Sequence, residues 1–314
     1  MILESADSIL WVQHWTIVSE FPGLLGESPF WDHDEQALYW IDIADSSIRR
    51  SVAGERMKTW RVHSTPGCIA PRAAGGLAIA LRDGIYMADR WGADLAKVAQ
   101  LPYELSEFRA NDGKAGPDGR FWVGTMYEPR DRRRAGLYSV DLSRGRDAEI
   151  WLQANNATVG NGLAWSPDGC VLYWGDTTDH VVRAWDWDSQ ANSMDNGRIF
   201  HEFRRKPAGW RPGDPGYGGR PDGAAVDVLG NYWCAMFEGG RIVQISPRGE
   251  LIGEMAVPFL CPTMVCFGGD EMKTLYVTSS RQNRSTEELA AYPLSGHVVS
   301  TRVETPGLPV NRVC

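Results

Sequence analysis

The stretch DGAAVDVLGNYWCAMFEGGRIVQISPRGELIGEMA, residues 222–256, contains four short apolar runs separated by turns. The turns carry Gly, Asn, Asp and Pro, the residues that hairpins between antiparallel strands require. Tyr232 and Trp233 open the second run, and Arg241 opens the third. No long helical periodicity interrupts the pattern, so the stretch predicts one four-stranded antiparallel sheet.

The same pattern recurs six times along the chain. Each copy starts at one polar or small residue, which we call its anchor, and reaches a tight turn and then an aromatic strand. The anchors are Glu27, Gly76, Asn111, Asn161, Asp222 and Thr263. Their spacings of 49, 35, 50, 61 and 41 residues are close to the period of a propeller blade. The sequence therefore predicts an all-β fold: a six-bladed β-propeller of four-stranded antiparallel blades around a central channel, as a single domain over residues 1–314.

Two segments lie outside the repeat. Residues 10–20 carry the apolar positions expected of a strand: Trp11, Val12, Trp15, Ile17 and Val18. We expect this strand to complete the last blade and so remove a sheet edge. The Gly- and Pro-rich residues 204–220 lead into Asp222. They are either a solvated connector or a lid or rim over the channel mouth, since long loops in compact domains often bind ligands.

Composition excludes several classes of function. The net charge of −8 and the pI near 5.3 argue against nucleic acid and anionic membranes as partners. No apolar stretch approaches 18 residues, and the first residues lack the basic and apolar regions of a signal peptide. The six cysteines form no CxxC pair, which favours reduced thiols. We expect a cytoplasmic protein, monomeric or a weak homodimer.

Four of the anchors are strongly polar: Glu27, Asn111, Asn161 and Asp222. The innermost strands of a propeller all run in the same direction, so these side chains should meet at one height on the axis. Singly, each is typical of turn chemistry. Together they form an oxygen cluster that suits Ca²⁺, Mg²⁺ or Mn²⁺ and could also hold Zn²⁺ or Fe²⁺. Two buried carboxylates repel unless a cation lies between them, so the sequence predicts a divalent metal in the channel.

Two arginines precede polar anchors by two residues. Arg109 stands before Asn111 and Arg220 before Asp222, so by strand alternation each points the same way as its anchor. A guanidinium fork beside a metal suits the oxygens of a small polar ligand, whereas a structural ion pair is the other interpretation.

The anchors and their neighbours resemble the SMP-30/gluconolactonase/regucalcin family. The motifs that carry the resemblance are LGESPFW (25–31), RANDGK (109–114) followed by GRFWVGTM (119–126), NGLAWSPD (161–168) and PDG (221–223). They occur in the family's order, and the resemblance covers roughly residues 20–295. It implies a six-bladed propeller with one divalent cation, Ca²⁺ in the first place, held by Glu27, Asn161 and Asp222.

The resemblance also implies an activity, the hydrolysis of lactones of sugar acids. Arg109 and Asn111 match substrate contacts of the family. Glu128 falls where some relatives have a further substrate contact, although Tyr127-Glu128-Pro129 departs from their Glu-Glu pattern. We add Arg220 to the predicted substrate contacts, on the strand alternation described above. The long loop before Arg220 is an elaboration, so the substrate cannot be copied from a relative.

We therefore predict a metal-dependent lactonase that opens an aldonolactone such as glucono-, xylono-, arabinono- or galactonolactone. The cation would polarise the carbonyl, and Asp222 would act as general base on the attacking water. Arg109 and Asn111 would orient the ring and hydroxyl oxygens. Two alternatives remain open: a phosphotriester or other ester hydrolase on the same metal site, and a calcium-binding or protein-interaction propeller without catalysis.

Overall fold

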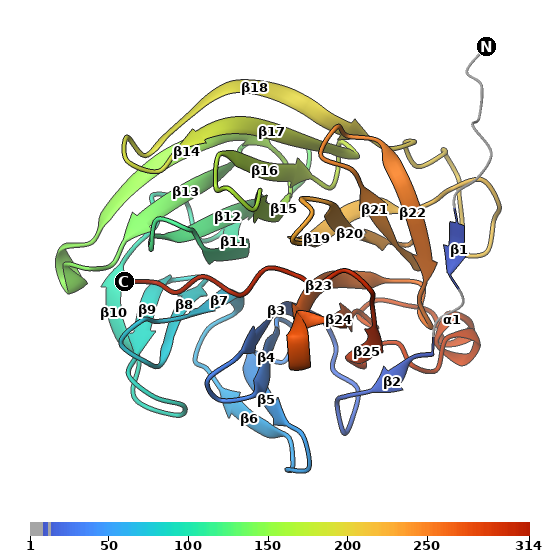
Figure 1. Ribbon diagram of the computed structural model, residues 1–314, viewed down its shortest axis with the longest axis horizontal. Helices are drawn as coiled ribbons and strands as arrows, with labels where there is room; N and C mark the ends of the chain where they lie inside the picture. Colours follow the sequence, from blue (N-terminus) through green and yellow to red (C-terminus); the bar gives the residue numbers. More distant parts are fainter. Residues whose placement is uncertain (1–8, 12–13) are drawn as a thin grey trace.

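The structure is a computed structural model that describes residues 9–11 and 14–314. It is built almost wholly of strands, which form six sheets arranged in a ring, each with four antiparallel strands (Figure 1). The predicted fold class, a six-bladed β-propeller, is confirmed. In the described residues no helix is long and apolar enough to cross a membrane.

Blades one to three follow the chain without interruption, each running from its innermost to its outermost strand. Blade one consists of β3 (Gly26–Asp32), β4 (Ala37–Asp42), β5 (Ser47–Val52) and β6 (Lys58–Arg61). Blade two consists of β7 (Pro66–Pro71), β8 (Leu77–Leu81), β9 (Gly84–Ala88) and β10 (Ala96–Ala99). Blade three consists of β11 (Phe108–Ala115), β12 (Phe121–Tyr127), β13 (Ala135–Asp141) and β14 (Glu149–Ala157).

Blades four to six repeat the same order, with the long loop between blades four and five. Blade four consists of β15 (Gly160–Trp165), β16 (Val171–Asp176), β17 (Val181–Asp188) and β18 (Ser193–Glu202). Blade five consists of β19 (Arg220–Val226), β20 (Tyr232–Phe237), β21 (Arg241–Ile245) and β22 (Leu251–Ala256). Blade six contains β23 (Pro262–Gly268), β24 (Thr274–Ser279) and β25 (Val299–Arg302), with the helix α1 (Thr286–Ala291) before β25.

The N-terminal segment contributes two short strands rather than the one expected over residues 10–20. β2 (Thr16–Ile17) pairs antiparallel with β25 and is the outermost strand of blade six. β1 (Ile9–Trp11) runs parallel to β22 and adds a fifth strand to blade five. Val12 lies outside the described residues. The segment therefore joins two neighbouring blades.

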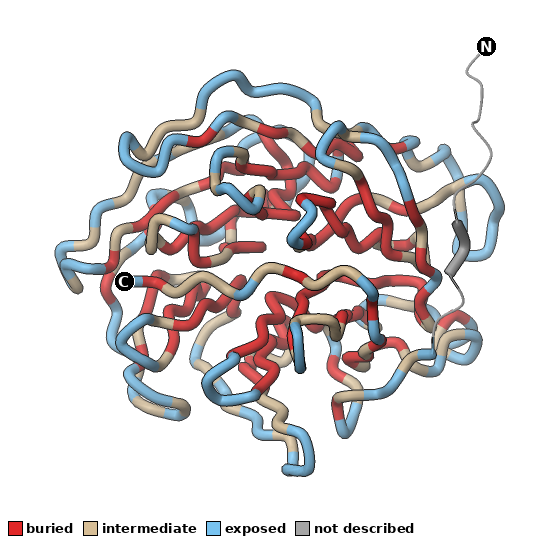
Figure 2. Tube along the Cα trace, in the orientation of Figure 1, coloured by how far each residue is buried: buried red, intermediate tan, exposed pale blue. Residues whose placement is uncertain are grey.

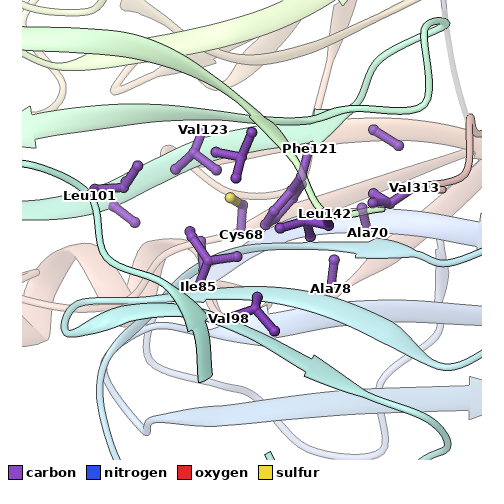
Figure 3. Packing of buried hydrophobic residues seen from close by; sticks show 14 residues of the cluster. Cys68, Ala70, Ala78, Ile85, Val98, Leu101, Phe121, Val123, Leu142 and Val313 are labelled. Atoms are coloured by element: carbon purple, nitrogen blue, oxygen red, sulfur yellow. The ribbon is translucent and has the colours of Figure 1, made fainter. Parts of the chain in front are cut away.

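The hydrophobic core is divided among the blade interfaces. Six clusters of buried side chains occur in the described residues, and each lies between two adjacent blades. Figure 3 shows the cluster between blades two and three, where Cys68 and Ile85 face Phe121 and Val123. Because both faces of each sheet are covered, strands such as β4 are buried at every position instead of alternately. Figure 2 shows the resulting buried centre and exposed outer edge.

The anchor of blade two is Gly67, and our prediction of Gly76 is wrong. Gly76 lies in the turn before β8, and Ile85-Tyr86, which the repeat predicts as the aromatic second strand of this blade, belongs to β9, the third strand. Gly67 lies in β7, the innermost strand, and a Cβ there would come within 2.4 Å of the backbone of Ala110 in blade three. With Gly67 the first two spacings become 40 and 44 residues, which are more even than 49 and 35.

Candidate metal centre and active site

The four polar anchors lie near the starts of the innermost strands, at one end of the channel. Glu27 is in β3, Asn111 in β11, Asn161 in β15 and Asp222 in β19. The innermost strands contact one another in sequence and β23 contacts β3, so the ring closes around these residues. The four are buried, with 4–8% of their surface exposed.

A one-residue register shift occurs at or beside every anchor. In β3 it falls between Glu27 and Phe30, and in β15 between Asn161 and Ala164. The residue after each of these anchors has a positive φ, 49° at Ser28 and 66° at Gly162. A bulge of this kind changes the direction in which the side chain of the anchor points. Ser28 adopts this conformation as well, but at Gly162 a Cβ would also lie 2.2 Å from the Tyr232 hydroxyl, so a glycine is required there.

A chain of hydrogen bonds fixes the two amide anchors. Asn111 Nδ2 donates to Asn161 Oδ1 at 2.8 Å and to the Gly160 carbonyl at 2.9 Å. Asn161 Nδ2 donates to Thr177 Oγ1 at 2.8 Å, and Thr177 Oγ1 donates to the Pro221 carbonyl at 2.7 Å. Both amide nitrogens are thus held by protein acceptors, so Asn161 keeps an oxygen lone pair available for a cation.

Burial perturbs the two carboxyl anchors. It raises the pKa of Glu27 well above its ordinary value, and the negative charges of Asp222 and Asp112 raise it further. Burial also raises the pKa of Asp222 to about 8, an effect that the positive charge of Arg220 opposes and that of Asp112 supports. Glu27 Oε2 accepts a hydrogen bond from the Ser28 backbone at 3.1 Å. Among the described residues no hydrogen-bond donor reaches the Asp222 carboxylate.

Asp112 and Lys114 follow the anchor Asn111 in β11. Asp112 Oδ2 accepts from the Leu163 backbone at 2.9 Å, whereas its Oδ1 is buried without a hydrogen-bond partner. Lys114 Nζ donates to the Ala224 carbonyl of blade five and so reaches across the channel. Burial lowers the pKa of Lys114, and the charge of Asp112 acts against this shift. These two residues thus connect β11 with β15 and β19.

The donor set fits a hard divalent cation. Glu27 and Asp222 supply carboxylate oxygens, and Asn161 supplies an oriented amide oxygen. A positive charge between the two carboxylates would relieve their mutual repulsion. Within the described residues, no group of three or more His, Cys, Asp or Glu side chains is arranged for metal binding. The candidate set therefore depends on the amide, and it differs from a structural zinc site of Cys and His ligands.

Arg109 and Glu128 lie beside the anchors but are engaged with the protein. An Arg109 terminal nitrogen donates to Asn111 Oδ1 at 2.7 Å, and Arg109 Nε lies 3.8 Å from Glu128. Glu128 accepts two hydrogen bonds from Arg82, at 2.8 and 2.9 Å, and these lower its pKa. Arg109 thus forms a structural ion pair, which is one of the two interpretations of this residue. Because it also lies beside Asn111, it stays a predicted ligand contact.

The loop before β19 packs on the rim of the channel. Lys206 donates to Glu238 at 2.8 Å, and Arg220 lies 3.2 Å from the same carboxylate. Tyr217 shares a 2.8 Å hydrogen bond with His180 of blade four. These contacts tie the loop to blades four and five, so it forms part of the rim instead of a free connector.

Sequence reasoning did not single out Thr177, Asp112 and Lys114, and it left the basic run 130–134 open between a solvated hairpin tip and a substrate clamp. These three residues take their roles from partners on other strands. Asp112 and Lys114 stand inside the motif RANDGK, and Asp112 resembles an ordinary turn residue there. Their position in the innermost strand, directly after Asn111, is the one signal that could have placed them near the channel.

Known proteins resemble this chain over nearly its whole length. Residues 25–281 match the family model described as the SMP-30/gluconolactonase/LRE-like region. The chain is 42% identical to a 6-deoxy-6-sulfogluconolactonase of Pseudomonas putida, covering 91% of this chain and 94% of that protein. It is 31% identical to regucalcin of Danio rerio, covering 87% and 88%. The crystal structure of a calcium-binding regucalcin of Agrobacterium tumefaciens superimposes with a TM-score of 0.88 at 23% identity, covering 98% and 100%.

Proposed function

The chain belongs to the SMP-30/gluconolactonase/LRE-like family, and we propose that it hydrolyses the lactone of a sugar acid with the help of one divalent cation. The observation that carries the proposal is the convergence of two buried carboxylates and one oriented amide at one end of the channel. The lactonase activity of the Pseudomonas relative supports the reaction class. The regucalcin relatives support a divalent cation, with Ca²⁺ as the first candidate.

Glu27, Asn161 and Asp222 would hold the cation. When bound there, it supplies a Lewis acid that stabilises negative charge on the carbonyl oxygen of the substrate. The oxygens of these residues are the ligands that such a hard cation prefers. The amide of Asn111 and the hydroxyl of Thr177 keep Asn161 in its orientation through the 2.8 Å hydrogen bonds.

Asp222 is our candidate general base. It would accept a proton from the attacking water, and the same proton would then pass to the ring oxygen as the ester C–O bond breaks. The product is the open-chain hydroxy acid, so lactone plus water balances the reaction. The positive charges of Arg220, Arg109 and Arg130 favour the carboxylate form that a base requires. Arg109, Asn111, Glu128 and Arg220 are the candidate substrate contacts around it.

The proposal is tested by ring opening in a pH-indicator assay on a panel of pentono- and hexonolactones. The protein is stripped with chelator and re-supplied with Ca²⁺, Mg²⁺, Mn²⁺, Zn²⁺ or Fe²⁺ singly. We expect one metal to restore activity on one class of lactone. Metal binding without turnover would favour the non-catalytic calcium-binding alternative, and turnover of an organophosphate alone would favour the phosphotriesterase.

Two variants with a matched control test the residues. Glu27→Gln and Asp222→Asn remove a ligand charge at nearly constant volume, so each should reduce kcat/KM by at least about 100-fold. Thr263→Ser alters the anchor of blade six, whose hydroxyl donates to the Gly26 carbonyl at 2.6 Å, and should leave activity nearly unchanged. Full activity in both carboxyl variants, with cooperative unfolding retained, contradicts the mechanism.

A further inference from the structure

The rim of the channel carries more positive than negative charge, although the whole chain has a net charge of −8. Glu128 forms ion pairs with Arg82 and Arg109, and the charge of Arg130 also acts on it. It accepts two hydrogen bonds from Arg82 and lies 3.8 Å from Arg109. Three guanidinium groups therefore share one carboxylate on this side of the rim.

The opposite side of the rim has a similar surplus. Glu238 is buried and lies within 2.8 Å of Lys206, 3.2 Å of Arg220 and 3.3 Å of Arg284. Arg284 has a second partner, Glu288, at 2.6 Å, but within the described residues Lys206 and Arg220 form ion pairs with Glu238 alone. The Nε of Arg220 is buried and makes no hydrogen bond. A buried donor in this state is costly unless a ligand satisfies it.

Arg130 lies between these two sides. It follows β12 by three residues, and its φ of 58° is a conformation that few non-glycine residues adopt. Its charge acts on Asp222, Arg109 and Glu128, and Arg220 repels it. Within the described residues Arg130 forms no salt bridge. The backbone thus holds the Arg130 guanidinium near the positive charges of Arg109 and Arg220, beside the candidate site, and no carboxylate forms an ion pair with it in the described residues.

Glu27 and Asp222 do not balance this surplus under the proposed function, since they are the candidate ligands of the divalent cation. We infer that the lactone substrate carries an anionic substituent, and that Arg130 and Arg220 hold this group at the rim while the lactone carbonyl lies at the polar anchors. The inference rests on the proposed function. The matching chemistry is an oxyanion, either a sulfonate, a phosphate or a carboxylate, because guanidinium forks bind such groups with paired hydrogen bonds.

The test compares lactones that differ in one substituent. The substrates are glucono-1,5-lactone and the same lactone with a sulfonate, a phosphate or a carboxylate at C6, each corrected for spontaneous opening. We expect kcat/KM to be at least about 10-fold higher for one of the anionic lactones. The preference should shrink at high ionic strength, because salt screens the rim charges. Equal kcat/KM values for neutral and anionic lactones overturn the inference.

Arg130→Gln should lower the ratio of anionic to neutral kcat/KM by about 10- to 100-fold, mainly through KM, and Arg130→Lys should lower it less. Arg132→Gln is the matched control, because Arg132 lies in the same loop, is exposed and pairs with the adjacent Asp131 at 3.9 Å. It should leave the ratio unchanged. A fall of both kcat/KM values by the same factor in Arg130→Gln, with the melting temperature unchanged, contradicts the assignment.

A binding measurement separates this inference from the proposed function. If no lactone is hydrolysed, the proposed function fails, and calorimetric titration with gluconate and with its C6-phosphate and C6-sulfonate forms still tests the rim. Tighter binding of an anionic form that disappears in Arg130→Gln supports the inference by itself. Equal affinities for all three compounds overturn it.

Discussion

Thr177 decides how Asn161 presents its amide to the channel. Its hydroxyl accepts from Asn161 Nδ2 and donates to the Pro221 carbonyl, so one side chain connects blade four with the strand that carries Asp222. Loss of such an outer partner lowers metal affinity by about 10–100-fold in proteins with comparable sites. At the scale of single residues, we therefore expect the orientation of the candidate ligands to be as important as their identity.

We predict that Thr177→Val reduces divalent-cation affinity by about 10-fold or more while the protein still unfolds cooperatively. Isothermal titration of the chelator-stripped protein measures this. Thr278→Val is the control, because Thr278 is also buried and bonds to Thr263, the anchor of blade six, outside the candidate ligand set. An equal loss of affinity in both variants would mean that the effect is general loosening of the ring.

The perturbed carboxyl of Asp222 predicts how the metal-free protein responds to pH. Its pKa is raised from an ordinary value of 3.8 to about 8. Between these values the folded state holds a proton that the unfolded state has lost, so stability decreases as pH rises. We expect the melting temperature of chelated protein to fall by a few degrees from pH 5 to pH 9, less so in Asp222→Asn. Added divalent cation should raise the melting temperature most at high pH. A melting temperature of the chelated protein that does not change with pH contradicts the prediction.

The sequence predicted the four polar anchors because each stands at a constant distance from a recognisable turn. It could not show which of them bond to one another. The bonds Asn111–Asn161 and Thr177–Pro221 join residues 50 and 44 positions apart, and Arg82 reaches Glu128 across 46. Such partners are set by the closure of the ring. The catalytic, metal and substrate assignments themselves stay predictions.

At the scale of elements, blade two shows where the repeat pattern misleads. β8 is Leu-Ala-Ile-Ala-Leu, without the aromatic residue found in the second strand of the other blades, so the aromatic Tyr86 of β9 was assigned to the wrong strand. Its anchor is a glycine because the Ala110 backbone leaves no room for a side chain. The missing polar anchor therefore reflects close packing of β7 against β11, and this packing is invisible in the sequence.

At the scale of the whole molecule, the ring is closed by two devices. β2 pairs with β25 through only two residues, Thr16 and Ile17. The chain after β25 then crosses one face of the ring, as the red segment that ends at C in Figure 1 shows. It bonds to Val226 of blade five through Leu308 and to Pro71 of blade two through Val313, at 3.3 and 2.9 Å. We call residues 308–314 the strap.

The strap lies at the end of the channel away from the polar anchors. A cavity of about 310 Å³ lies between the strap and the polar anchors. It is lined by later residues of the innermost strands, such as Trp31 and Trp165, and by Leu308–Asn311 of the strap. Since the innermost strands all run in the same direction, their later residues mark the far end. Arg312 adds contacts to Asp32 and Asp34 at 3.2 and 2.7 Å.

Stability and activity should therefore separate when the strap is removed. Deletion of residues 308–314 exposes the interface around the fully buried Val313 and breaks its backbone bonds to blade two, so we expect the melting temperature to fall by roughly 5–10 °C. Val313→Ala should lower it less, through the cavity it leaves. Cation affinity and lactone turnover at 20 °C should stay within about threefold, since the anchors lie at the other end. Loss of cation binding with an unchanged melting temperature would contradict this prediction. It would show that the strap supports the candidate site and that β2 alone closes the ring.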